Sequence, residues 1–179
     1  MRTINDKQDA PTNIEGSELE DIDEFVYLDS KICQTGGTDE DIQARINKAR
    51  QVFAMLRPVW RVTTISTNTK LRIFNSNVKS VLLYGSETWR VLSSTSSTSK
   101  IQTFINRCLR QILRIRWFDK VRNTDLWEKA KQEPIDVQIR ERKWRWLGHR
   151  LRKDPENTAR QALDWNPQGK RKRGHPRQT

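Results

Sequence analysis

The chain has 179 residues, of which 34% are hydrophobic and 31% are charged, so a small core and a heavily charged surface are expected. Seven tryptophans exclude a wholly disordered chain, because disordered segments contain few aromatic residues. Two distant cysteines, Cys33 and Cys108, exclude a disulfide framework, and no apolar run approaches the ~20 residues that a membrane-spanning helix needs. Because the N-terminus is polar and acidic as well, we expect an intracellular protein, nuclear or cytoplasmic, that is not secreted and has no membrane partner.

The net charge of +12 is distributed unevenly along the chain. Residues 1–40 contain three basic and eleven acidic residues, whereas residues 41–179 contain 31 basic and eleven acidic ones. An acidic N-terminal segment followed by a basic remainder, the basic body (residues 41–179), predicts two structural units. The positive charge of the basic body suits a polyanionic partner. The alternative is an ordinary helical protein with solvated basic faces. The alternation of basic residues with Trp and Phe favours nucleic acid.

The sequence pattern of the first 115 residues predicts a short β segment followed by three helices. Residues 1–37 are expected to form strands and turns, with a hairpin at 13–19 and a strand at 25–28. A helix near 42–60 should follow the cap Thr38 and be bent or ended by Pro58. Further helices are expected at 70–84, capped by Ser66 or Thr67, and at 101–115, with the Ser/Thr run 93–99 as a surface loop between them. Their apolar stripes predict one core that buries Ile46, Phe53, Phe74, Leu82, Phe104 and Leu109.

Helical signals continue toward the C-terminus. A short helix is expected at 124–132, a longer one from Pro134 to about residue 153, and a last one at 157–164. Residues 166–179 are too polar and basic to bury a core, so a mobile tail is expected there. The sequence therefore predicts a mainly α fold with a small β element (α+β).

No catalytic or metal-binding residue is predicted. Two-metal nucleotidyl transfer needs carboxylates that converge on a metal pair. Five acids instead crowd on one expected turn and read as solvated surface: Glu18, Glu20, Asp21, Asp23 and Glu24. Cys33, Cys108, His149 and His175 lack the paired spacing of zinc ligands. Cys108 lies on an apolar helix side, where we expect it to act as a buried small hydrophobe.

Candidate phosphate-binding residues occupy three places in the basic body. On the polar side of the helix at 101–115, and just beyond it, they are Arg107, Arg110, Arg114 and Arg116. On the helix that starts at Pro134 they are Arg142, Lys143, Arg145, Arg150 and Arg152, and in the tail they are Lys170, Arg171, Lys172 and Arg173. The tail run also fits a nuclear-import signal. Trp144 is expected to face the core, whereas Trp146 fits either the core or a stacked base.

Several sequence segments resemble motifs of a known protein family, and they occur in order over nearly the whole chain. They are FVYLDS at 25–30, the run from Gly36 to Arg50, KLRIFNSNVKSVLLYG at 70–85, ETW at 87–89, QEPI at 132–135, RERKWRWLGH at 140–149 and WNPQGKR at 165–171. The first resembles the F-x-Y-L-G-S segment of non-LTR retrotransposon reverse transcriptases. Together these segments resemble the C-terminal part of endonuclease–reverse transcriptases of the RTE-like, LINE-type group.

The resemblance implies three regions. Residues 1–37 would be the end of a polymerase palm with its primer grip, 38–118 a helical thumb, and 119–179 a basic post-thumb extension. The primer-grip-like residues would be Phe25, Tyr27, Leu28 and Asp29. Asp29 departs from the family pattern, which usually has Gly there, and an acid is unfavourable beside nucleic acid.

The resemblance also implies a function. The family's catalytic aspartates and endonuclease precede these segments, so the parent activity would be RNA-directed DNA synthesis. Mg²⁺ would serve only the missing palm, and this chain would hold no cofactor. Its partners would be RNA and DNA, as template and primer, and the rest of the reverse transcriptase in the parent polyprotein.

Two other functions stay open from the residues alone. One is a non-enzymatic RNA- or DNA-binding protein derived from a mobile element. The other is a protein-interaction module that uses the Trp-rich helix. A strong salt dependence of RNA binding would separate both nucleic-acid functions from the protein-interaction module.

Overall fold

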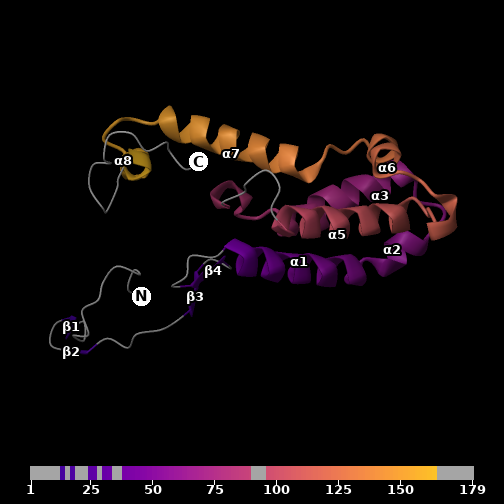
Figure 1. Cartoon of the computed structure of the whole chain (residues 1–179), viewed down its shortest axis with the longest axis horizontal. Coiled ribbons are helices and arrows are strands. Elements are labelled where there is room, and N and C mark those ends of the chain that lie inside the picture. Colours follow the sequence, from indigo (N-terminus) through magenta and orange to yellow (C-terminus); the bar gives the residue numbers. More distant parts are fainter. Residues whose placement is uncertain are drawn as a thin grey trace.

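The computed structural model describes residues 13–14, 17–18, 24–27, 30–33, 38–89 and 96–164. This part of the chain is mainly α-helical, as the sequence predicted. Three long helices, α1 (Thr38–Met55), α5 (Ser96–Ile112) and α7 (Ile135–Leu151), lie in successive layers (Figure 1). Among the described helices, none combines the length and the apolar character needed to cross a membrane.

The strands form two short antiparallel pairs. β1 (Asn13–Ile14) pairs with β2 (Ser17–Glu18). β3 (Glu24–Tyr27) pairs with β4 (Ser30–Cys33), so that Phe25 lies opposite Ile32. The Phe25 side chain is exposed. Of the other primer-grip-like residues, Leu28 and Asp29 lie outside the described residues, as do the tail residues 170–173.

The first predicted helix is divided at Pro58, as expected. α1 starts at Thr38 with three acids in its first turn, where the positive end of the helix dipole favours them. It ends at Met55, and α2 (Arg57–Arg61) follows with Pro58 in its first turn, where a missing N–H costs nothing. The Trp60 Nε1–H donates to the Phe53 carbonyl oxygen at 2.9 Å and so ties α2 back to α1.

The second predicted helix consists of three pieces. α3 (Thr67–Ile73) begins at the predicted cap Ser66, whose Oγ accepts a hydrogen bond from the Thr69 backbone N–H at 3.2 Å. A π-helical segment, η1 (Phe74–Lys79), and a short α4 (Ser80–Leu82) continue it. Gly85 then adopts a φ of +75°, a left-handed conformation that glycine accepts without steric cost, and η2 (Ser86–Thr88) follows.

The apolar stripes of these helices meet in one core. All six residues that the sequence placed there are buried: Ile46, Phe53, Phe74, Leu82, Phe104 and Leu109. The Phe53 ring stacks on Trp60 at a centroid distance of 5.1 Å, and Phe74 meets Phe53 edge-on at 6.3 Å. The short helix α6 (Asn123–Ala130) adds Leu126, and the first half of α7 adds two further isoleucines.

The prediction of a surface loop over residues 93–99 was wrong at its end. Residues 96–99 form the first turn of α5, and the Ser97 and Thr98 side chains are buried. The Ser97 hydroxyl donates to the Asp39 carboxylate on α1. A hydroxyl with a partner on a neighbouring helix can be buried at little cost, and the composition of the segment does not reveal that partner.

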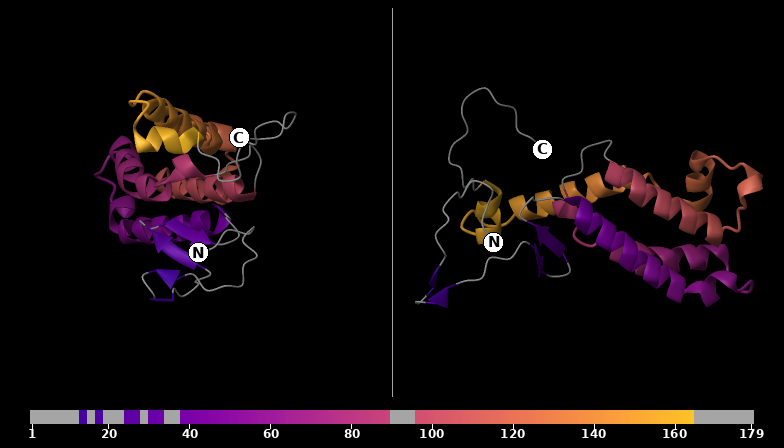
Figure 2. Two further views of the ribbon diagram at one scale, coloured as in Figure 1. Left: turned by 90° about the vertical axis from the view of Figure 1, so that its left-hand side faces the viewer. Right: turned by 60° about the horizontal axis from the view of Figure 1, so that its bottom comes forward.

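The prediction that Trp144 faces the core was also wrong, because its side chain is 63% exposed. α7 packs through Ile135 and Ile139, and then runs past the end of α5 (Figures 1 and 2). α7 also contacts the turn at η2 and the seven-residue helix α8 (Thr158–Asp164). At about 3.6 residues per turn, Trp144 lies nine residues from Ile135 and five from Ile139, on roughly the opposite side of the helix from these packing residues. Leu151 shares the side of Trp144 and is exposed as well.

Candidate nucleic-acid interface

An open groove of about 580 Å³ lies between α1 and α5. Its floor is formed by buried apolar side chains, among them Ile46, Phe53, Phe104 and Cys108. Its rim carries four exposed cations, Arg50, Arg57, Lys100 and Arg107. None of the described residues that line the groove is Asp or Glu. The groove therefore combines an apolar floor with a positively charged rim.

Helical spacing explains this arrangement. Arg50 follows Ile46 by four residues, and Arg57 follows Phe53 by four residues across the α1–α2 junction. Residues four apart are neighbours on a helix surface, so each cation lies at the border of the apolar stripe. On α5, Lys100 and Arg107 flank Phe104 in the same way. Long basic side chains can cover apolar surface with their stems while their charged ends stay in water.

Cys108 belongs to the groove floor and is not a reactive thiol. Its side chain is buried, and burial raises the pKa of the thiol to about 12, although the nearby Arg107 and Arg50 oppose the rise. The thiolate is the nucleophile and the metal ligand, so this cysteine stays neutral and inert near pH 7. The prediction of a buried small hydrophobe is confirmed.

Of the four arginines predicted around the end of α5, only Arg107 lines the groove. Arg110 donates to the Val121 carbonyl at 3.3 Å and to Asn123 Oδ1 at 2.8 Å, which anchors the segment before α6. Arg114 donates to the Arg61 carbonyl at 2.9 Å and so joins α2 to the end of α5. These two guanidinium groups are therefore partly engaged in holding the bundle together.

Arg116 lies at the N-terminal end of η3 (Trp117–Asp119). Its guanidinium carbon is 5.8 Å from the centre of the Phe118 ring. Sequence reasoning included Arg116 but missed Arg50, Arg57 and Lys100. The available signal was their four-residue or seven-residue spacing along the edges of two apolar stripes.

The cations of α7 lie on another side of the bundle. Figures 1 and 2 place α7 on the side of α5 that faces away from α1. Arg142 lies 3.6 Å from the Glu87 carboxylate and donates to the Leu83 carbonyl at 3.4 Å, so it holds α7 to the turn around η2. Arg145 lines a smaller polar pocket of about 380 Å³. Lys143 is half-buried and Arg152 is exposed.

Trp146 is half-buried, and the Arg150 guanidinium carbon lies 5.5 Å from the centre of its ring. A cation over one face of an aromatic ring is a favourable cation–π contact. That face is therefore already occupied in the folded chain. The indole is neither a core residue nor a fully open stacking surface.

Lys79, at the end of the π-helical segment, is a buried cation that the sequence did not single out. Its Nζ donates to Gln132 Oε1 at 2.6 Å, which ties the linker between α6 and α7 to η1. Burial and, to a smaller extent, repulsion from Arg142 lower the pKa of its ammonium group to about 8, whereas Glu133 opposes the shift. Lys79 also lines the polar pocket that Arg145 borders.

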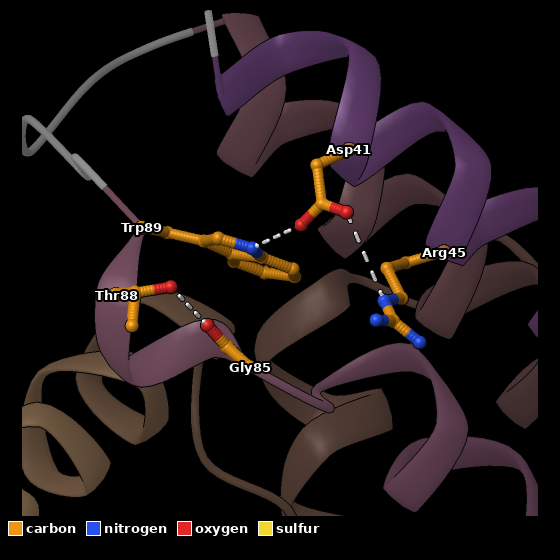
Figure 3. A network of polar contacts seen from close by, with 5 residues as sticks. All are labelled: Asp41, Arg45, Gly85, Thr88 and Trp89. Atoms are coloured by element: carbon orange, nitrogen blue, oxygen red, sulfur yellow. Dashed lines mark hydrogen bonds and ion pairs between the residues drawn. The ribbon is translucent and has the colours of Figure 1, made fainter. Parts of the chain in front are cut away.

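A buried polar network fixes the start of α1 to the turn that follows α4 (Figure 3). Asp41 Oδ2 accepts a hydrogen bond from Trp89 Nε1–H at 2.9 Å, and Arg45 Nε lies 4.0 Å from Asp41 Oδ1. The Arg45 guanidinium is also 4.7 Å from the centre of the Tyr84 ring. Because Asp41, Arg45 and Trp89 are buried, this network is structural and not a binding site.

Within the described residues, no group of three or more His, Cys, Asp or Glu side chains comes together where a metal ion could bind. The cations at the groove instead suit an anion. Their side chains can approach phosphate oxygens as charge-assisted hydrogen-bond donors.

Residues 52–84 match the family model of a domain of unknown function (DUF6451). The chain is also 25% identical over 156 residues to an uncharacterized transposon-derived protein of Caenorhabditis elegans. The matched segment is 84% of this chain and 54% of the relative, so the chain spans about half the length of the curated relative it matches. No solved structure matches the chain significantly. The similarity to the transposon-derived protein, although weak, suggests that the chain originates from a mobile element.

Proposed function

We propose that this chain is the thumb-like bundle and basic extension of a non-LTR retrotransposon reverse transcriptase, and that it holds template and primer nucleic acid. The groove between α1 and α5 carries the proposal, because four exposed cations and, among the residues that the structure describes, no carboxylate line it. The similarity to a transposon-derived protein and the sequence segments quoted above support an origin from such a retrotransposon. In this proposal the chain contributes no catalytic residue, and the rest of the polymerase is its partner in the parent polyprotein.

The charge pattern of the groove suits a phosphate backbone. All four charged residues that line it in the described part of the chain are basic, and a concentration of one sign of charge attracts a polyanion. This groove brings Arg50 and Arg57 from one side and Lys100 and Arg107 from the other around one opening. Phosphates bound at the rim would release counterions, and the apolar floor could contact sugar and base surfaces. Contacts of this kind hold nucleic acid with little sequence preference.

A salt titration tests the proposal. The test variant replaces Arg50, Lys100 and Arg107 with glutamine, and binding to a single-stranded RNA is measured from low to physiological salt. If each cation neutralises one phosphate, the slope of log K against log salt should become shallower by about 2, because each phosphate contributes about 0.7 on single strands. Affinity should fall for all sequences alike.

The matched control variant replaces three exposed cations that do not line the groove, Arg72, Lys129 and Arg140, with glutamine. It changes the net charge by the same amount, so its slope should change much less than that of the groove variant. Equal changes in both variants would contradict the groove as the binding site. A wild-type affinity that is insensitive to salt would contradict nucleic-acid binding, and it would favour a protein-interaction role for the Trp-rich α7.

A further inference from the structure

The turn at η3 presents two aromatic side chains to solvent just beyond the end of α5. Trp117 is 90% exposed and Phe118 is 54% exposed. Large aromatic side chains contribute most to stability when they are buried, and Trp is highly buried on average. An almost fully exposed Trp adds little to the stability of the bundle. Trp117 is therefore a candidate for contact with a ligand.

Local contacts fix the conformation of this turn. Asp119 Oδ2 accepts a hydrogen bond from the Arg116 backbone N–H at 2.6 Å, and the Asp119 N–H donates to the Arg116 carbonyl at 3.1 Å. The rings of Trp117 and Phe118 meet edge-to-face, with centroids 5.9 Å apart and an interplanar angle of 76°. Side chains that are already positioned lose less conformational entropy when a ligand binds.

The charges around the turn suit an anionic ligand. Arg114, Arg116, Lys120 and Arg122 surround the two aromatic residues in the sequence, and all four side chains are exposed. Asp119 is the one acid between residues 113 and 122, and its carboxylate is engaged by the Arg116 backbone. Exposed aromatic rings among cations are the arrangement by which proteins bind single-stranded nucleic acid.

The turn follows the groove-lining part of α5 closely in the chain. Gln111 lines the groove, and its carbonyl accepts a hydrogen bond from the Arg114 backbone N–H at 3.3 Å. The Arg114 side chain reaches the Arg61 carbonyl on α2, the helix that begins with the rim residue Arg57. These contacts tie the segment that leads into the turn to α2 and to the end of α5, on which the groove residues Arg57 and Gln111 lie.

We infer that Trp117 stacks on an unpaired base of a single-stranded nucleic acid whose backbone lies along the groove, with Phe118 supporting the indole edge-on. The inference rests on the proposed function and adds a base-contacting residue and a preference for unpaired strands. Every base has a π face, so stacking tolerates any sequence. Bases inside a duplex are covered by their neighbours, so a duplex offers Trp117 a face only at its ends.

Binding of wild type, Trp117→Ala and Trp117→Phe to an unstructured single-stranded RNA and to a blunt RNA duplex tests this inference. Trp117→Ala should weaken single-strand binding by about 5- to 150-fold, which is the range for loss of one stacked base. The salt slope should stay unchanged, duplex binding should change much less, and Trp117→Phe should retain most of the affinity. Trp144→Ala removes the exposed tryptophan of α7 and is the matched control, with single-strand affinity close to that of wild type.

The outcomes separate this inference from the proposed function. Wild-type single-strand affinity in Trp117→Ala would overturn the inference, and so would an equal loss on duplex or an equal loss in Trp144→Ala. The groove variant would still report on the proposed function in each of these cases. Failure of the wild-type chain to bind nucleic acid would overturn both. Thermal unfolding followed by circular dichroism should be unchanged in Trp117→Ala, because the side chain is exposed.

Discussion

Replacement of Phe74 with alanine tests whether the π-helical segment lies at the centre of the core. The Phe74 side chain is 0% exposed and meets the Phe53 ring edge-on at 6.3 Å, with an interplanar angle of 86°. Truncation of a buried phenylalanine costs about 3–5 kcal/mol in transfer and cavity terms. Because Phe74 is fully enclosed and the aromatic pair is lost too, we expect a loss of about 5 kcal/mol in the free energy of unfolding.

Phe104→Ala provides an internal comparison with the same chemical change. Phe104 is 8% exposed and lines the groove, so the volume that its ring vacates opens to water. A site that does not leave an empty cavity avoids part of the cost, and we expect a loss of about 3 kcal/mol. The difference between the two variants, about 2 kcal/mol, measures how much more enclosed Phe74 is.

Urea unfolding followed by far-UV circular dichroism measures both values. Domains of ordinary stability have only about 5–15 kcal/mol in total, so in a domain at the lower end of this range Phe74→Ala leaves too little folded protein for a transition to be fitted. Phe74→Leu keeps most of the apolar volume and should remain folded with a smaller loss. The reasoning is refuted if Phe104→Ala costs as much as Phe74→Ala, or if Phe74→Leu costs more than Phe104→Ala.

Three further predictions concern the buried hydrogen bond of Trp89, the pKa of Lys79 and polymerase activity. Trp89→Phe removes the N–H donor to the buried Asp41 carboxylate and should lower the free energy of unfolding by about 1.5–3 kcal/mol in the same assay; no change would show that the network in Figure 3 does not stabilise the fold. Lys79 has a pKa of about 8 in the folded chain and 10.5 as its ordinary value, so unfolding takes up a proton between these values. Wild type should therefore become more stable as pH rises from about 8 to 10.5, relative to Lys79→Met, and parallel curves for the two proteins would contradict this. Purified chain should show no templated primer extension with Mg²⁺ or Mn²⁺, and nucleotide-dependent extension would show that the chain does contribute catalytic residues.

Much of the helical architecture followed from the sequence, because the signals involved are local. The apolar stripe of α5 predicted Phe104 and Leu109 as core residues, and both are buried. Ser66 was recognised as a cap and Pro58 as the end of a helix from residues within one turn of each. Periodicity and capping depend on neighbours up to four residues away, and a sequence displays those neighbours directly.

Other features depended on which helices lie next to each other. The groove joins Arg50 on α1 to Arg107 on α5, and neither position shows in the sequence that it faces the other. Trp144 lies on a helical stripe with Leu147 and Leu151, but it is exposed because α7 packs through the opposite side, which carries Ile135 and Ile139. A stripe predicts that a face is apolar, whereas burial needs a partner surface that only the tertiary arrangement supplies.

The same distinction applies to the polar residues. Arg110 and Arg107 lie three residues apart on α5, yet Arg110 holds the segment before α6 and Arg107 lines an open groove. Trp117 looks like any other aromatic residue in the sequence, and its 90% exposure appears only in the folded chain. Residue type determined by itself which groups could bind an anion or stack on a ring. The tertiary structure decided which of those groups are left available, because each hydrogen bond or packing contact within the fold occupies a surface that a ligand would need.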